Sequence, residues 1–137
     1  MTAFEQIAAY LSVAASIKDL MTIYAYDPMM AWNAYAKESK TPEIEAIIND
    51  PSSKPTILSL TIIDSDLLRE LIEDAHDCLD LHRTSLADGI TPKQRDEADL
   101  DADRCMCEVL NRIKKYNGGE LPADTVLHRW WVSYRCL

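Results

Sequence analysis

The sequence predicts an all-α fold, a single compact bundle-like domain of about six helices. Its 137 residues include only three Gly and six Pro, whereas β-sandwiches and barrels need a turn signal every ~8–12 residues. Apolar residues recur at steps of three and four along several long segments, which is the helical period. Three of these segments begin with Asp-Pro or Thr-Pro, residue pairs that favour the first turn of a helix.

The N-terminal third is expected to hold three helices. A long amphipathic helix starts at Thr2, because the apolar residues that follow form one stripe. A second helix over 28–39 begins at Asp27-Pro28, and a short third helix begins at Thr41-Pro42. The stripe of the first helix consists of Phe4, Ile7, Leu11, Ala14, Ile17, Met21 and Tyr24.

The rest of the chain is expected to contain three more helices. Residues 50–55 hold two Pro and two Ser and predict a loop. Residues 56–63 are rich in β-branched side chains, but no second strand candidate could pair with them, so we expect a buried helical or irregular segment. Helical patterns then run from Ser65 to Asp88-Gly89, from Thr91-Pro92 to residue 116, and onward from Pro122.

Size and composition indicate one domain over residues 1–137, located in the cytoplasm. A chain of this length can bury around two thirds of its unfolded surface, so it needs no metal or disulfide for stability. The N-terminus has no basic region typical of a signal peptide, and no stretch reaches the ~20 apolar residues that span a bilayer. We therefore expect no membrane association, and free thiols at all four cysteines.

Acidic residues are concentrated in the middle of the chain. Residues 57–103 contain four basic and thirteen acidic side chains, a net charge of −9 that equals the net charge of the whole protein. Without a basic stripe, direct nucleic-acid binding is not expected. An acidic face favours a protein partner with a basic surface, although a solvated surface that keeps the protein soluble explains the charge equally well. The acids expected on the outer helix faces are Glu70, Glu73, Asp74, Asp77, Asp80, Asp96, Asp99 and Asp103.

Trp130 and Trp131 complete the predicted partner-binding residues. Adjacent helical residues point ~100° apart, so both indoles are buried only if the helix is nearly surrounded. An exposed tryptophan beside arginine and tyrosine is typical of interaction hot spots. The alternative is that both pack into the core.

One local cluster has zinc-ligand chemistry. Cys78 and His82 lie one helical turn apart, and Cys105 on the next long helix could supply a third ligand. No Cys-x-x-Cys occurs in the chain, and buried cysteines are common core residues. We therefore expect no metal and no cofactor.

No motif identifies an enzyme. Gly-x-Ser-x-Gly, a glycine-rich phosphate loop and His-Glu-x-x-His are all missing from the sequence. Glu73 and His76 form one Glu-x-x-His, but a di-metal carboxylate bundle requires a second copy on another helix. The sequence therefore predicts a protein without enzymatic activity.

In size and charge alone, the chain resembles small acidic helical proteins of phages and mobile elements, anti-CRISPR proteins among them. The resemblance implies a binding module that inhibits a nucleic-acid-handling protein by engaging its basic surface. Two alternatives stay open: a metal-dependent or thiol enzyme built around Cys78, His82 and Cys105, and a structural protein that oligomerises through surfaces rich in Met and Trp.

Overall fold

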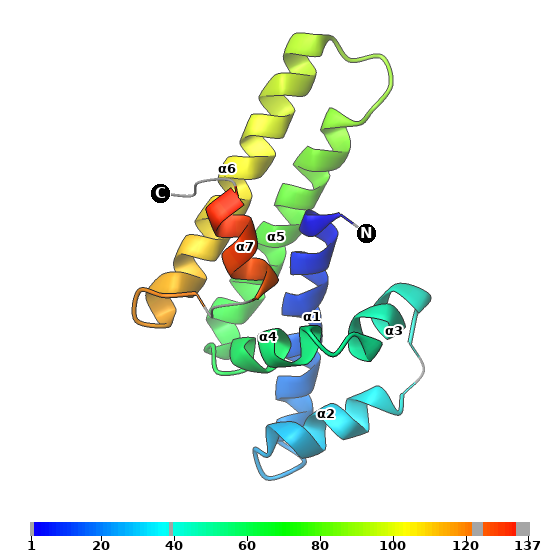
Figure 1. The fold of residues 1–137 in the computed structure, drawn as a ribbon, viewed down its shortest axis with the longest axis vertical. Coiled ribbons are helices and arrows are strands. Elements are labelled where there is room, and N and C mark those ends of the chain that lie inside the picture. Colours follow the sequence, from blue (N-terminus) through cyan, green and yellow to red (C-terminus); the bar gives the residue numbers. More distant parts are fainter. Residues whose placement is uncertain (1, 39, 122–124, 134–137) are drawn as a thin grey trace.

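Seven α-helices and no strand make up the part of the chain that the computed structural model describes, residues 2–38, 40–121 and 125–133 (Figure 1). The all-α prediction is confirmed, with one helix more than expected. The predicted helix start at Pro122 lies outside the described residues. The helices are α1 (Ala3–Met21), α2 (Pro28–Ala36), α3 (Pro42–Asn49), α4 (Ser53–Leu60), α5 (Ser65–Ser85), α6 (Pro92–Tyr116) and α7 (Val126–Ser133).

The two longest helices, α5 and α6, form an antiparallel hairpin that makes up one end of the molecule (Figure 1). Helix α1 packs along α5, and α7 contacts both α1 and α6. Helices α2, α3 and α4 gather at the opposite end, and the α5–α6 connection extends well beyond α1 (Figure 1). The acidic middle of the sequence, residues 57–103, therefore contributes α5 and the first half of α6 to this projecting hairpin.

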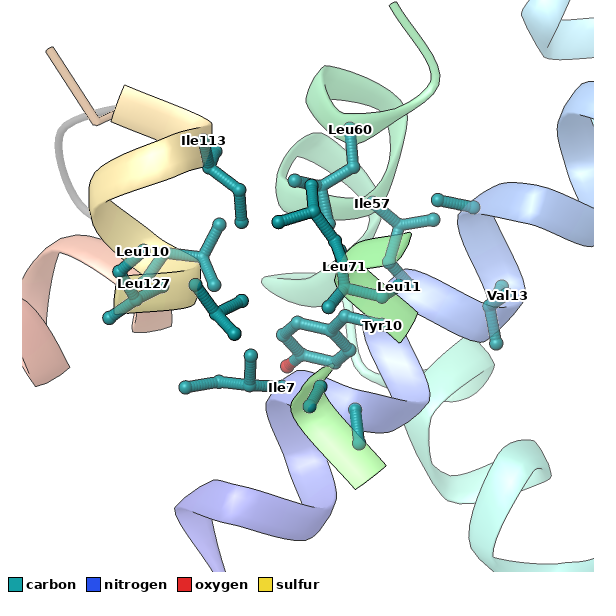
Figure 2. Packing of buried hydrophobic residues seen from close by; sticks show 14 of the residues in the cluster. Ile7, Tyr10, Leu11, Val13, Ile57, Leu60, Leu71, Leu110, Ile113 and Leu127 are labelled. Carbon is teal, nitrogen blue, oxygen red and sulfur yellow. The ribbon is translucent and has the colours of Figure 1, made fainter. Parts of the chain in front are cut away.

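A single apolar core joins these helices. Leu11 of α1, Leu71 of α5 and Leu110 of α6 are fully buried and point into a shared interior with Leu127 of α7 (Figure 2). Because residues from four helices remove their apolar surface from water together, the packing of each helix depends on the others.

The additional helix is α4. It overlaps residues 56–63, the β-branched segment that the sequence predicted to be either helical or irregular. Ile57, Leu60 and Ile63 are fully buried there, as expected for a buried helical segment. The predicted loop over 50–55 is shorter than expected, because Ser53 already begins α4. Its buried hydroxyl donates to the carbonyl oxygens of Ile47 and Asp50 and so ties the end of α3 to α4.

The turn between α1 and α2 contains two consecutive residues other than glycine in the left-handed region. Ala25 has φ 54° and Tyr26 has φ 63°. The Tyr26 N–H donates to the carbonyl of Met21, 2.7 Å away, where α1 ends. Left-handed backbone costs roughly 1–2 kcal/mol per residue with a Cβ, so this turn holds Tyr26 in place against a local preference.

Candidate functional site

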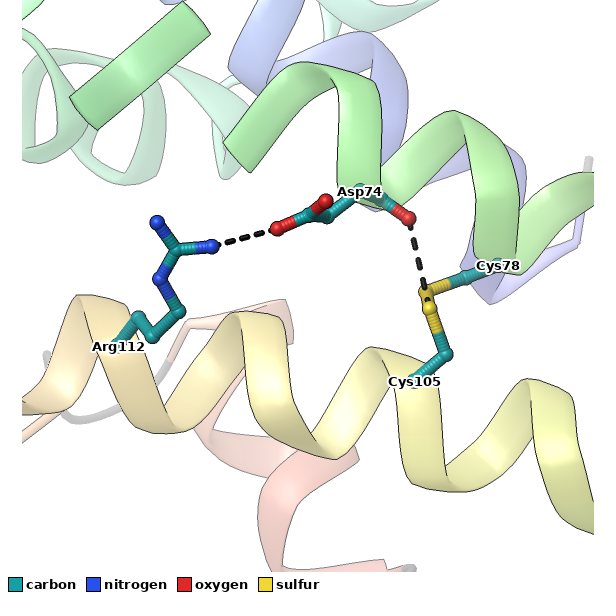
Figure 3. Close-up of a disulfide and its surroundings, with 4 residues drawn as sticks. All are labelled: Asp74, Cys78, Cys105 and Arg112. Atoms are coloured by element: carbon teal, nitrogen blue, oxygen red, sulfur yellow. Dashed lines mark hydrogen bonds and ion pairs between the residues drawn. A yellow bond between two sulfur atoms is a disulfide. The ribbon is translucent and has the colours of Figure 1, made fainter. Parts of the chain in front are cut away.

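A disulfide bond joins the two helices of the acidic hairpin. Cys78 of α5, which is fully buried, is bonded to Cys105 of α6, with their Cα atoms 5.4 Å apart (Figure 3). Cys107 is disulfide-bonded as well. The expectation of free thiols is therefore wrong for these three cysteines. Disulfides persist mainly in oxidising compartments, whereas the sequence predicts a cytoplasmic location, which stays a prediction.

The disulfide also removes the candidate zinc site. Zinc binds thiolates, and in this bond neither Cys78 nor Cys105 has one to offer. His82 instead stacks on Phe4 of α1, with ring centroids 4.6 Å apart. In the described ranges no group of three or more His, Cys, Asp or Glu side chains is placed to hold a metal ion. While Cys78 and Cys105 are joined in the disulfide, neither has a free thiol that could act as a nucleophile.

Arg112 of α6 neutralises two of the predicted partner-binding acids. Its guanidinium donates to Glu70 at 2.6 Å and to Asp74 at 2.5 Å. The contact with Asp74 and the disulfide connect the same two helices at neighbouring positions along the hairpin (Figure 3). The Cys105 Sγ lies 3.5 Å from the carbonyl oxygen of Asp74. These two charge-assisted contacts of Arg112 connect α6 to α5, as the disulfide does, and we call them the Arg112 clamp. They leave Glu70 and Asp74 less available to a partner.

No sequence motif pointed to Arg112 as a residue of this site. The feature of the sequence that could have indicated its role is its position: Arg112 precedes Ile113 and follows Val109 by three residues, and both of these belong to the buried side of α6. An arginine at the edge of an apolar stripe can reach across to the neighbouring helix while its stem stays packed.

The remaining predicted acids form two separate rows. Glu73, Asp77 and Asp80 follow each other at helical steps of three and four on α5, and all three are exposed. We call them the α5 row. Asp96, Asp99 and Asp103 repeat the spacing on α6, with Asp103 half-buried, and form the α6 row.

The α6 row lies on a different side of the hairpin from the Arg112 clamp. Asp103 and Arg112 are nine residues apart, which places them about 180° apart around α6 at 100° per residue. Asp103 is also close enough to His82 for their charges to interact. The α6 row therefore does not share a face with Glu70 and Asp74, which Arg112 contacts.

Five of the six row carboxylates take part in no ion pair with another described residue. Among the ion pairs of the described residues, none involves a member of the α6 row, and Asp80 is the only member of the α5 row that has one. Asp80 lies 3.9 Å from Arg83, and both side chains are largely exposed, so the pair contributes little. Both rows thus present nearly their full negative charge to the surroundings.

Burial and the neighbouring charge of Asp99 both raise the pKa of Asp103 in the α6 row. Burial has the larger effect on this pKa, and the charge of His82 partly offsets the two. Because the folded state holds the Asp103 proton more tightly, ionisation of Asp103 destabilises the fold as pH rises through the shifted pKa. The charge in this row therefore has a cost in stability.

The two tryptophans have different environments. Trp130 is buried, and its ring lies 5.7 Å from Phe4 in an edge-to-face arrangement. It belongs to the core, so its assignment to the contact surface is wrong. Trp131 is half-buried, with the Lys114 ammonium 4.6 Å from its ring centroid. Tyr134 and Arg135, which share this aromatic segment in the sequence, lie outside the described residues.

None of the helices in the described part of the chain is long and apolar enough to cross a bilayer. No known family model, curated protein or solved structure matches this chain.

Proposed function

We propose that this protein is a binding module without enzymatic activity that presents its α5 and α6 rows to a basic surface of a partner protein. The observation that carries the proposal is the charge of α5 and the first half of α6: residues 57–103, which contain them, have a net charge of −9, and five of the six row carboxylates take part in no ion pair within the described ranges. Such a surface attracts a basic partner and speeds the encounter.

The hairpin is well suited to hold these rows in a fixed arrangement. The Cys78–Cys105 disulfide and the Arg112 clamp both connect α5 to α6, and α1 supports α5 from the side of the core. A surface that is ordered before binding loses less conformational entropy when it binds. The two clamps therefore favour binding as well as folding.

Proteins that handle nucleic acids are the class of partner that fits this surface. They bind phosphates through clusters of Lys and Arg, and rows of carboxylates compete for the same side chains. A module that occupies such a cluster would inhibit the partner by excluding its nucleic acid, and it would not bind nucleic acid itself.

Two charge-matched triple variants test the proposal by affinity capture from a lysate of the source cells. The row variant carries Glu73→Lys, Asp77→Lys and Asp99→Lys. The control variant carries Asp19→Lys, Glu45→Lys and Glu120→Lys, three exposed positions outside α5 and α6. Each substitution adds two charges, so both variants change the net charge from −9 to −3.

The wild type and the control variant are expected to capture the same basic partner, and the row variant is expected to lose it while its helical circular dichroism spectrum stays unchanged. Equal capture by a correctly folded row variant would contradict the proposal. Loss from both variants would show that overall charge matters and that the rows do not.

A further inference from the structure

A pocket lies between the C-terminal end of α6 and helix α7. Its volume of about 350 Å³ falls at the lower end of the range for small-molecule sites. The end of α6, the connection that follows it and α7 all contribute to its walls. The lining residues are Lys114, Gly119, Glu120, Leu121, His128 and Trp131. No member of the α5 row or the α6 row lines this pocket, so it is separate from the surface proposed for the basic partner.

Two glycines form the turn where α6 ends and the pocket begins. Gly118 has φ 78° and Gly119 has φ 99°, and residues with a Cβ adopt this left-handed region only at a cost. The N–H of Gly119 donates to the carbonyl oxygen of Lys114, 2.8 Å away. Leu121 then enters the core, with only 7% of its surface exposed. The turn thus places a buried leucine and a lysine on the same pocket.

Two half-buried side chains of the pocket have no polar partner among the described residues. The Lys114 ammonium lies 4.6 Å from the centroid of the Trp131 ring. Neither Lys114 nor the His128 ring takes part in an ion pair or a side-chain hydrogen bond with another described residue. Ammonium groups removed from water are normally paired with an anion, and this chain has 23 acidic residues that could have supplied one. The unused N–H donors therefore favour an anionic ligand from outside the chain.

The charges around the pocket favour a ligand with one negative charge. Lys114 attracts an anion, whereas the exposed carboxylate of Glu120 opposes a second negative charge. The α6 row repels an anion little at this position. Its nearest member, Asp103, precedes Lys114 by eleven residues, which is about 16 Å along the helix axis, and the Debye length at physiological salt is ~8 Å.

We infer that this pocket binds a small aromatic monocarboxylate. The carboxylate accepts hydrogen bonds from Lys114 and His128, and the ring packs against the indole of Trp131 and the side chain of Leu121. The charged contacts orient the ligand, and the apolar contacts bury its ring. Binding at this pocket does not require the proposed basic partner, so each idea can fail without the other.

An NMR titration of the purified full-length chain with four small probes tests the inference. Benzoate has the ring and the carboxylate, benzyl alcohol has the ring without the charge, and acetate has the charge without the ring. Phenyl phosphate has the ring and carries nearly two negative charges. Benzoate is expected to shift the indole N–H signal of Trp131 until the site is saturated. The other three probes should bind about tenfold more weakly or less, because each lacks one of the matching contacts.

Lys114→Met removes the ammonium and keeps an apolar side chain. It should weaken benzoate binding about tenfold, the loss of one hydrogen bond to a charged group, and should leave the binding of benzyl alcohol unchanged. Lys115→Met is the matched control. It makes the same change in net charge at an exposed neighbour that does not line the pocket, so the affinity for benzoate should stay the same.

Glu120→Gln alters an exposed residue, so the fold should persist. It should raise the affinity for phenyl phosphate more than the affinity for benzoate, because it removes the negative charge that opposes a second charge on the ligand. This variant and the four probes decide the question even if Lys114→Met does not fold.

The inference would be overturned if benzoate showed no saturable binding, or if acetate bound as tightly as benzoate. Full affinity for benzoate in a correctly folded Lys114→Met variant would overturn it as well. Equal gains for phenyl phosphate and benzoate in Glu120→Gln would contradict the selection of a single negative charge.

Discussion

Removal of the Cys78–Cys105 disulfide is expected to lower the free energy of unfolding by about 3–4 kcal/mol. The two cysteines are 27 residues apart in the sequence, and the bond restricts the unfolded chain by closing that loop. The loss should appear as a lower midpoint in urea for the double variant Cys78→Ala, Cys105→Ser. Alanine suits the buried position of Cys78, and serine suits the half-buried position of Cys105.

A reducing agent alone would not isolate this effect, because Cys107 is also disulfide-bonded. Cys107→Ser is therefore the matched control, and its own loss of stability gives the contribution of the second bond. A double variant as stable as the wild type would show that the hairpin is held by packing and the Arg112 clamp without help from the disulfide.

Phe4→Ala is expected to cost about 3–5 kcal/mol, the range for removing a buried phenylalanine. Phe4 is only 5% exposed and connects three helices, since it lies on α1, stacks on His82 of α5 and contacts Trp130 of α7. The cavity left by alanine would loosen the N-terminus of α1 and the docking of α7 together. Denaturant unfolding measures the loss.

Phe4→Leu is the control for this variant, because it keeps most of the apolar volume and should cost clearly less. Near-ultraviolet circular dichroism should show a weaker tryptophan signal in Phe4→Ala than in Phe4→Leu. A loss below about 1 kcal/mol for Phe4→Ala would contradict the role of Phe4 as the junction of the three helices.

Helix starts could be predicted from the sequence because they depend on a few adjacent residues. Asp27, Thr41 and Thr91 cap α2, α3 and α6 through their side chains, each followed by proline. Helix ends were less accurate. The apolar stripe predicted that the first helix continues to Tyr24, but α1 ends at Met21, where the left-handed turn begins.

The contacts between helices could not be predicted, since they depend on how the helices align in the folded state. Apolar stripes locate the buried side of α5 and of α6, yet only the alignment of the two helices brings Cys78 to Cys105 and Arg112 to Glu70. Which of Trp130 and Trp131 is buried depends likewise on where α7 packs against Phe4.

Exposure of the acids was predicted more accurately than their pairing. Of the eight predicted acids, six are exposed, and Asp74 and Asp103 are half-buried. Helical periodicity locates the outer face of each long helix, but it does not show that Arg112 reaches across to Asp74. The candidate surface is therefore reduced from eight carboxylates to the six of the two rows.

The association rate constant of the captured partner, measured against salt concentration, tests the acidic-row account most directly. Surface plasmon resonance can compare the wild type, the row variant and the charge-matched control under identical conditions. For the wild type and the control, association should be fast at low salt and slow steeply as salt is added, because charges at the binding surface steer the encounter. The row variant should associate slowly at every salt concentration, with a dissociation rate that changes far less. Rate constants for the row variant equal to those of the wild type across the salt series would contradict the account.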